Sequence, residues 1–299
     1  MKDRIAAWKQ AFEQDDHAVL PSLTTFAWDF ATYLVLVRIV EDAPVDRDGR
    51  KMMGALLLEL LRKNFWESTV LAVRRLLDKS PLGGKKGVCS LAAIVADVKA
   101  CRNRLNRRVF VEGIAGLEYD DRAIEERYHA YVRERINQGT MAFGIPRELQ
   151  YENSRDRHKQ FDFLSGVAAD QRSEHDLIRP EIFEALEGRL DRLAAVADHA
   201  DTHFAHAATE FSRRGRVLNN WGVTEARDAL ELLTQTAELV GRWFVFTGVG
   251  DILPTAQFDK FAHLDRPLIQ PNSEERLEQV WDEFAAVTAR WPFIDDDQV

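Results

Sequence analysis

Three of the chain's eight histidines, His199, His203 and His206, fall within a span of eight residues. If this span is helical, each residue advances about 100° around the axis, so all three imidazoles project from one face, together with Arg192 and Glu210. Imidazole is the side chain that titrates near neutral pH. A row of imidazoles along one helix face therefore indicates a site where protons are exchanged or a ligand is bound.

Three interpretations of this histidine row are open. The row can be a solvated helix flank without function, or it can be a catalytic or interface site. In the third interpretation His199 and His203, four residues apart, ligate zinc or nickel together, with Glu210 as a further ligand. No remote cluster of ligands accompanies them in the sequence, so we expect no metal and no other cofactor.

The histidine row needs a helix to carry it, and the sequence predicts one continuous helix over residues 180–213. Pro180 suits the first turn of a helix, and Arg213-Arg214-Gly215 supplies a basic last turn with a glycine stop. We expect this helix to be central, with the histidines on the flank of a cleft or interface. The side chains expected to be buried are Leu190, Leu193, Ala197, Phe204 and Phe211, which belong to the apolar stripe Leu186, Leu190, Leu193, Ala197, Ala200, Phe204, Ala207 and Phe211.

The strongest basic cluster comprises Arg102, Arg104, Arg107 and Arg108, with two asparagines among them. Such a cluster can follow a phosphate backbone, because each guanidinium makes two parallel hydrogen bonds to phosphate oxygens. Cations are also favoured electrostatically in the last turn of a helix. The sequence therefore leaves open whether these arginines bind RNA or only stabilise a helix end.

Helical periodicity dominates the remaining chain, and no run of alternating apolar and polar residues indicates a strand. The sequence therefore predicts an all-α fold. Residues 138–179 are poor in periodicity, so we expect an irregular insertion there, with a short helix near Phe161–Leu164. Ser90 is the expected N-cap of one helix. Besides 180–213, the expected helices span residues 3–15, 22–41, 50–78, 90–110, 120–137, 223–247 and 273–290.

Two segments resemble the HEPN superfamily, and within it the AbiU2-like group of phage abortive-infection proteins. Residues 65–78 (FWESTVLAVRRLLD) are similar to that group's helix ending in an Arg-Leu-x-Asp element, and the helix start Ser90-Leu91 follows them. Residues 197–207 (ADHADTHFAHA) are similar to its Ala-Asp-Lys-x-x-Ala-His segment, with Ala205-His206 as the signature dipeptide. The resemblance extends over residues 22–108 and 180–247.

The resemblance implies a HEPN-like helical bundle, and in many members a metal-independent ribonuclease whose active site lies between two protomers and carries an Arg-x(4–6)-His motif. It implies His206 as acid–base residue with His199 beside it, and Arg192 or the arginines of 102–108 as phosphate ligands. Arg192 and His199 satisfy the motif's spacing. No arginine precedes His206 at that spacing. An alternative therefore stays open, a non-catalytic helical protein that uses the same surface for dimerisation or partner binding.

These observations lead to expectations about organisation and partners. We expect one domain over residues 1–299, with a HEPN-like core at 22–108 and 180–247, an insertion at 110–180 and a C-terminal extension at 250–299. We expect a homodimer of toxin or phage-defence type that acts on RNA and has an antitoxin or other protein partner. The net charge of −9 and the pI near 5.5 exclude a global positive field, so RNA binding would need a local basic patch.

The sequence also predicts where the protein works. The two cysteines, Cys89 and Cys101, cannot form a disulfide framework and suit a reducing compartment. The first residues contain no apolar stretch typical of a secretion signal. Residues 23–40 are apolar but are interrupted by Asp29 and Arg38, so we expect a buried helix and no membrane span. The expected localisation is cytoplasmic.

Overall fold

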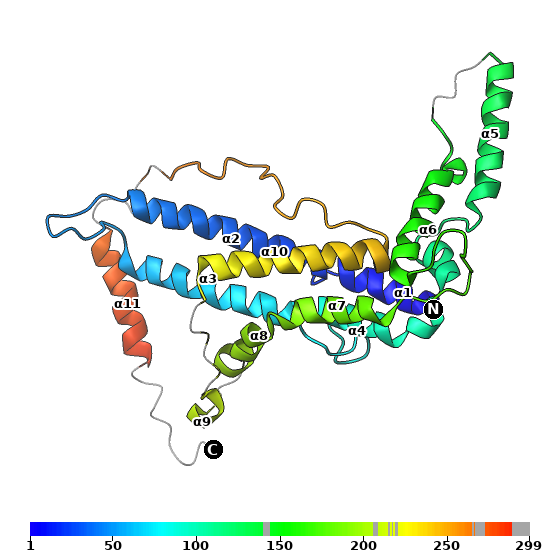
Figure 1. Ribbon diagram of the computed structural model, residues 1–299. Coiled ribbons are helices and arrows are strands. Elements are labelled where there is room, and N and C mark those ends of the chain that lie inside the picture. Colours follow the sequence, from blue (N-terminus) through cyan, green and yellow to red (C-terminus); the bar gives the residue numbers. More distant parts are fainter. Residues whose placement is uncertain are drawn as a thin grey trace. The chain divides into compact units, whose positions relative to one another are not determined.

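The computed structural model describes residues 1–139, 144–205, 209–214, 216, 218, 221–264, 266 and 273–288. Within these residues the regular structure is helical, and only two isolated β-bridges occur (Figure 1). The predicted all-α fold is confirmed. Residues 1–254 form one compact unit and residues 255–299 a second one. The two units are described separately, and the organisation as a single domain stays a prediction.

Three long helices form the centre of the first unit: α2 (Val19–Asp42), α3 (Ala55–Leu76) and α10 (Val223–Val240). They pack side by side (Figure 1). Ahead of them, α1 (Lys2–Lys9) and the π-helical turn η1 (Gln10–Gln14) bury Ile5, Trp8 and Phe12. These are the residues around which the sequence predicts the first helix.

α10 continues into the π-helical turn η6 (Gly241–Val245), which packs against α1. A Cβ atom on Gly241 would lie 2.7 Å from Cζ of Phe12 and 2.6 Å from the carbonyl oxygen of Thr247. Because no real side chain tolerates such distances, only glycine permits η6 to approach η1 this closely. The predicted helix over 223–247 therefore exists, with its last turn widened.

Helix α4 (Leu91–Ala100) begins at the predicted cap, because Oγ of Ser90 accepts a hydrogen bond from the Ala93 amide at 3.0 Å. The Ser90 hydroxyl also donates to the carbonyl of Asp78, just beyond the end of α3. The predicted helix over 90–110 ends early, followed by the 3-10 turn η2 (Arg102–Arg104) and the π-helical turn η3 (Val109–Ile114). Between these two turns, the Arg107 amide donates to the carbonyl of Asp176 at 3.1 Å.

Helices α5 (Asp121–Asn137) and α6 (Tyr151–Ser165) pack against each other. α5 matches the prediction over 120–137, with Asp120 as its cap. α6 corrects the expectation of an irregular segment with only a short helix near Phe161–Leu164. Its buried positions recur with helical spacing, but polar side chains occupy four of the six, so the apolar pattern is hidden: Ser154, Arg157, His158, Phe161, Leu164 and Ser165.

The predicted continuous helix over 180–213 is wrong. The chain forms α7 (Pro180–Asp191), α8 (Ala194–Ala200), the π-helical turn η5 (Asp201–Ala205) and α9 (Glu210–Arg213). The first break is at Leu193, whose φ of −102° and ψ of 6° lie outside the helical region. The helix then widens at η5, which contains Thr202. The Thr202 hydroxyl donates to the carbonyl of Asp198 at 2.8 Å and competes there with the backbone hydrogen bonds of the helix.

The break changes which residues of this segment are buried. Leu190 and Leu193 are buried, as predicted, and Ala197 is half-buried. Phe204 is 37% exposed and Phe211 is 82% exposed, so the prediction that both are buried is wrong. A straight helix would carry all five along one stripe, and the two changes of helical pitch rotate the later positions away from the core.

In the second unit, α11 (Glu274–Thr288) agrees with the helix predicted at 273–290. Its apolar side chains recur at helical spacing and are exposed: Leu277, Val280, Trp281, Phe284 and Val287.

Candidate functional site

The turn from α8 into η5 brings two of the predicted histidines together. The rings of His199 and His203 stack with their centroids 4.1 Å apart and their planes inclined by 24°. Nδ1 of His199 lies 3.1 Å from the carbonyl oxygen of Arg216. Nε2 of His203 is buried and has no hydrogen-bond partner within the described part of the chain. Burial and then the adjacent His199 lower the pKa of His203.

Arginines and aspartates surround this histidine pair. Nε of Arg74 on α3 lies 2.8 Å from Asp201, and its Nη1 lies 2.9 Å from Asp78. Arg216 pairs with Asp198 at 3.4 Å. The positive charge of Arg213 further lowers the pKa of His203. The neighbouring imidazole and this cation therefore disfavour the protonated form of His203.

The other residues predicted for this site are not joined to the pair. His206 lies outside the described residues. Arg192 is exposed at the junction between α7 and α8, where the helix breaks, so it no longer shares a continuous helix face with His199. In the described ranges, no group of three or more His, Cys, Asp or Glu side chains could hold a metal ion. Zinc or nickel binding by His199 and His203 stays a prediction.

The predicted RNA-binding arginines occupy four different environments. Arg102 donates from Nε to the carbonyl of Ile178 at 2.5 Å, and Arg104 is exposed. Arg107 is fully buried. Arg108 pairs with Glu112 at 2.9 Å and Glu174 at 2.8 Å. Arg104 therefore has the guanidinium most open to a phosphate, whereas Arg107 has no path to one.

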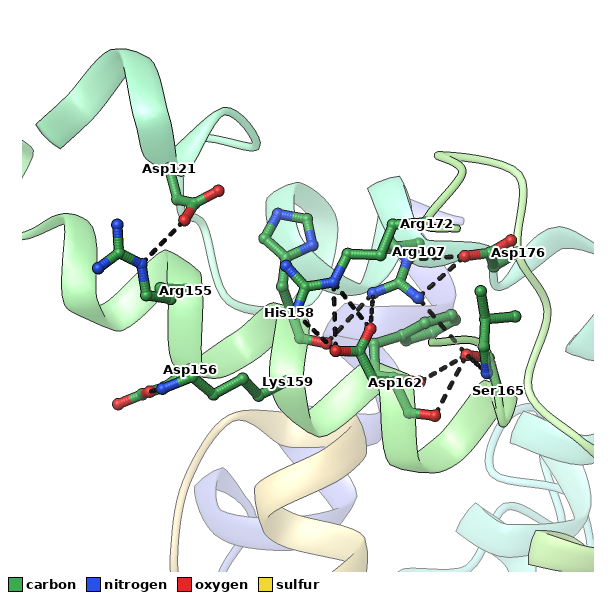
Figure 2. Close-up of polar contacts among 12 residues, drawn as sticks. Arg107, Asp121, Arg155, Asp156, His158, Lys159, Asp162, Ser165, Arg172 and Asp176 are labelled. Carbon is green, nitrogen blue, oxygen red and sulfur yellow. Dashed lines mark hydrogen bonds and ion pairs between the residues drawn. The ribbon is translucent and has the colours of Figure 1, made fainter. Parts of the chain in front are cut away.

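Figure 2 shows the network that surrounds Arg107. Its guanidinium lies 2.7 Å from Asp162 on α6 and 2.9 Å from Asp176, and Arg172 approaches the same Asp162 carboxylate to 2.5 Å. Burial raises the pKa of Asp162, but hydrogen bonds from Arg172 and Arg107 outweigh it and lower that pKa overall. The network connects α6 and residues 172–176 to the segment after α4. We therefore interpret it as a structural feature that stabilises the packing of these segments.

Exposed apolar side chains gather at one end of the α2–α3 helix pair, and the sequence analysis did not identify them. The second half of α2 and the first half of α3 carry most of them, and two more lie in the connection. We call this region the distal surface; it comprises Leu34, Ile39, Val45, Met52, Leu56, Leu57, Leu60 and Leu61, which are 36–74% exposed. The prediction of a buried helix over residues 23–40 is wrong beyond Phe30, because every side chain from 31 to 40 is half-buried or exposed. The available signal was the absence of a polar face between Leu34 and Val40.

One helical stretch, Lys2–Asp42, is long and apolar enough to cross a membrane, judged by length and composition only. Its part from Val19 to Phe30 contributes five buried residues to the core of the first unit. A core helix passes the same test of length and composition. The expectations of a cytoplasmic protein without a membrane partner stay predictions.

Comparison of the chain with protein-family models, curated proteins and solved structures gives no match. The resemblance to the HEPN superfamily therefore stays a prediction that depends on the two short segments.

Proposed function

We propose that this chain assembles with a second copy of itself through the distal surface. The observation that carries the proposal is the exposure of eight large apolar side chains on two adjacent helices and their connection. Soluble monomers rarely expose a contiguous apolar patch of this kind, because its burial is worth about 25 cal/mol for each Å² removed from water. A twofold pairing would bury the same patch on both copies.

The charges around the distal surface favour a second copy as the occupant. Both signs are interspersed there: Arg62 pairs with Glu59 at 2.7 Å, and Arg38 pairs with Glu41 at 3.2 Å. A surface of mixed sign can face a rotated copy of itself with opposite charges opposed. Nucleic acid would require a cationic surface. The hydrocarbon region of a membrane would exclude the Arg62–Glu59 pair.

Sedimentation velocity at micromolar concentration tests this proposal. We expect a dimer for the natural chain and a monomer for Leu57→Glu and Leu60→Glu, because each buries a charge at the pairing surface. Ile136→Glu is the matched control, since Ile136 is 68% exposed on α5, and this variant should stay dimeric. A natural chain that is monomeric and floats with phosphatidylcholine vesicles would contradict the proposal and assign the surface to a membrane.

A second function is favoured by the stacked histidines: metal-independent cleavage of RNA across the dimer. One imidazole of the His199–His203 pair would take the proton from a 2′-hydroxyl, and an imidazole would return one to the leaving oxygen. Arg213, whose charge acts on His203, would offset charge on the phosphate. His206 and Arg192 keep the roles that the HEPN resemblance implies for them, acid–base residue and phosphate ligand.

A fluorescent single-stranded RNA incubated in EDTA tests the nuclease function. We expect His203→Asn to reduce the cleavage rate about 10²–10⁴-fold, and His206→Ala to abolish cleavage. His175→Asn, which alters a 79% exposed histidine, should cleave at the natural rate. Cleavage that is equal in all four proteins, or that EDTA abolishes, would contradict this mechanism. Dimerisation is measured separately, so a dimer that does not cleave RNA would overturn the nuclease function and leave the assembly proposal standing.

A further inference from the structure

A cleft lies between the first half of α2 and the second half of α3, away from the distal surface; its outer wall includes Arg74 and Asp78, which also adjoin the histidine pair. Its inner pocket has a volume of about 290 Å³, and an adjoining outer pocket measures about 500 Å³. The two pockets share His17, Ser22 and Arg75 in their walls. The two pockets are therefore adjacent, and we treat them together as one cleft.

The two helices run in opposite directions along this cleft and carry different polar groups at its two ends. Residues from the start of α2 and the end of α3 line the same pockets, so the helices are antiparallel. Asp29 and Ser68 line only the inner pocket, whereas Ser22 and Arg75 line both. Seven residues separate Ser22 from Asp29, which corresponds to about 10 Å along the helix axis. Asp15, Asp78 and Arg74 line the outer pocket as well. Arg74 pairs with Asp78, and Asp15 accepts a hydrogen bond from the His17 amide, whereas Asp29 at the inner end and Arg75 at the mouth are left without such a bond among the described residues.

Neither of these charged groups has a partner among the residues that the structure describes. Within the described residues, no hydrogen bond or ion pair involves the carboxylate of Asp29 or the guanidinium of Arg75. Burial alone raises the pKa of Asp29, as expected of a carboxyl that leaves water without gaining a donor. The neighbouring Arg74 differs, because it pairs with both Asp78 and Asp201. Arg75 is exposed, so it is free to turn toward a ligand at the mouth, and the half-buried Asp29 is the group whose missing partner a ligand would supply.

The rest of the wall limits what this ligand can be. Phe26, Leu71 and Ala72 give the inner pocket an apolar side, and the hydroxyls of Ser22 and Ser68 offer neutral hydrogen-bond partners. Asp16 and Asp29 outnumber Arg75 among the charges of the inner pocket, which disfavours a polyanion such as RNA. A ligand that meets both Asp29 and Arg75 must carry a positive and a negative charge at its two ends. The backbone positions are about 10 Å apart along the helix axis, and the arginine side chain shortens the distance that the ligand has to span.

We propose that the cleft binds a small zwitterion, a short apolar chain with an ammonium group at one end and a carboxylate at the other. The ammonium lies against Asp29 and the inner hydroxyls. The methylene chain packs on Phe26 and Leu71, and the carboxylate receives the fork of Arg75 at the mouth. This inference concerns a different surface from both proposed functions and does not depend on either.

Three probes of equal chain length test the charge pattern: 6-aminohexanoate, hexylamine and hexanoate, each titrated into the full chain and followed by calorimetry and amide NMR shifts. We expect 6-aminohexanoate to bind at least tenfold more tightly than either singly charged probe. Asp29→Asn should weaken 6-aminohexanoate and hexylamine at least tenfold and leave hexanoate unchanged. Arg75→Gln should weaken 6-aminohexanoate and hexanoate and leave hexylamine unchanged.

Asp170→Asn, a change at an exposed aspartate outside the cleft, is the matched control and should bind all three probes as the natural chain does. Equal weak binding of the three probes, or binding unaffected by Asp29→Asn and Arg75→Gln, would overturn the proposal. No detectable binding of any probe up to about 10 mM would overturn it too.

Thermal unfolding provides a readout that requires no ligand. A carboxylate kept for a ligand destabilises the empty protein, so Asp29→Asn should raise the unfolding midpoint by roughly 2–4 °C. Bound 6-aminohexanoate should raise the midpoint of the natural chain and leave that of Asp29→Asn unchanged. A lower midpoint for Asp29→Asn would identify Asp29 as a structural residue and overturn the assignment.

Discussion

The two ends of the α2–α3 helix pair have similar apolar sequences and opposite environments. At the inner end, Leu23, Phe26 and Phe30 of α2 face Phe65 and Val73 of α3, and all of these are buried. At the distal end, eight large apolar side chains are exposed. Within the first unit, α10 and η1 pack against α2, and α8 and α10 pack against α3.

An aromatic cluster marks the boundary between the two ends. Tyr33 stacks on Phe65 with ring centroids 3.7 Å apart, and the edge of Trp66 meets Tyr33 at 5.5 Å. Beyond these rings the helices continue for about three further turns each with apolar side chains in solvent. The difference teaches that an apolar helix is buried only where the fold supplies a second surface, and that the remainder is available for a partner.

The largest expected effect is a difference in stability between two truncated variants, one at each end of the helix pair. Phe26→Ala at the inner end should reduce the free energy of unfolding by about 3–5 kcal/mol, because it removes a fully packed ring. Leu57→Ala at the distal end should change the stability of the monomer by less than about 0.5 kcal/mol. Urea titration of dilute protein measures both. Equal losses in the two variants would contradict the distinction between the ends.

A second test concerns a buried polar group of the first unit, the guanidinium of Arg157 on α6. The buried guanidinium of Arg157 donates to the carbonyls of Arg242 at 2.5 Å and Trp243 at 2.7 Å and lies over the ring of Phe110. Burial lowers the pKa of Arg157 to about 9. Arg157→Met leaves the carbonyls of η6 unsatisfied and should cost about 2–4 kcal/mol in urea titration.

Arg133→Met is the control for this test, because Arg133 is exposed on α5. It should change stability by less than about 0.5 kcal/mol. A similarly small loss for Arg157→Met would mean that water replaces the guanidinium at the end of η6.

The smallest expected effect is a pH dependence of the free energy of unfolding that arises from the buried His158. His158 is buried, its Nε2 lies 2.7 Å from the carbonyl oxygen of Tyr119, and its Nδ1 has no partner within the described residues. Burial and then the charges of Arg172 and Arg107 lower its pKa, whereas the Tyr119 carbonyl and Asp121 act in the opposite direction. As the pH falls, the imidazole therefore takes up a proton in the unfolded chain first and stays neutral in the folded chain to a lower pH.

Because the unfolded state binds more protons, His158 gives its full stabilisation above the unfolded pKa of about 6.5. The stabilisation is lost as the pH falls from there toward the folded pKa. Urea titrations at pH 7.5, 6.5 and 5.5 should show this decline, and His158→Gln should flatten it. His175→Gln, at an exposed histidine, should leave the slope unchanged. An unchanged slope in His158→Gln would assign the decline to other groups.

The sequence by itself determined the local features. Helical periodicity predicted the all-α fold, the cap at Ser90 and the start of α5, because capping and side-chain spacing involve only neighbouring residues. It also placed His199 and His203 on one helix face, since residues four apart are adjacent in any helical turn. α6 was missed because Arg157 and His158 are polar by type and become buried only when η6 and Tyr119 satisfy their hydrogen bonds.

Tertiary structure decided the rest. Whether Arg107 meets RNA or Asp162 depends on a residue 55 positions away, so no local pattern distinguishes the two outcomes. The breaks near Leu193 and Thr202 moved Phe204 and Phe211 out of the core, although a straight helical wheel places them inside. Asp29 interrupts an apolar sequence, but only the packing of α2 against α3 places it in a cleft, where no described residue pairs with it. Burial depends on what packs opposite a side chain, and that is a property of the whole fold.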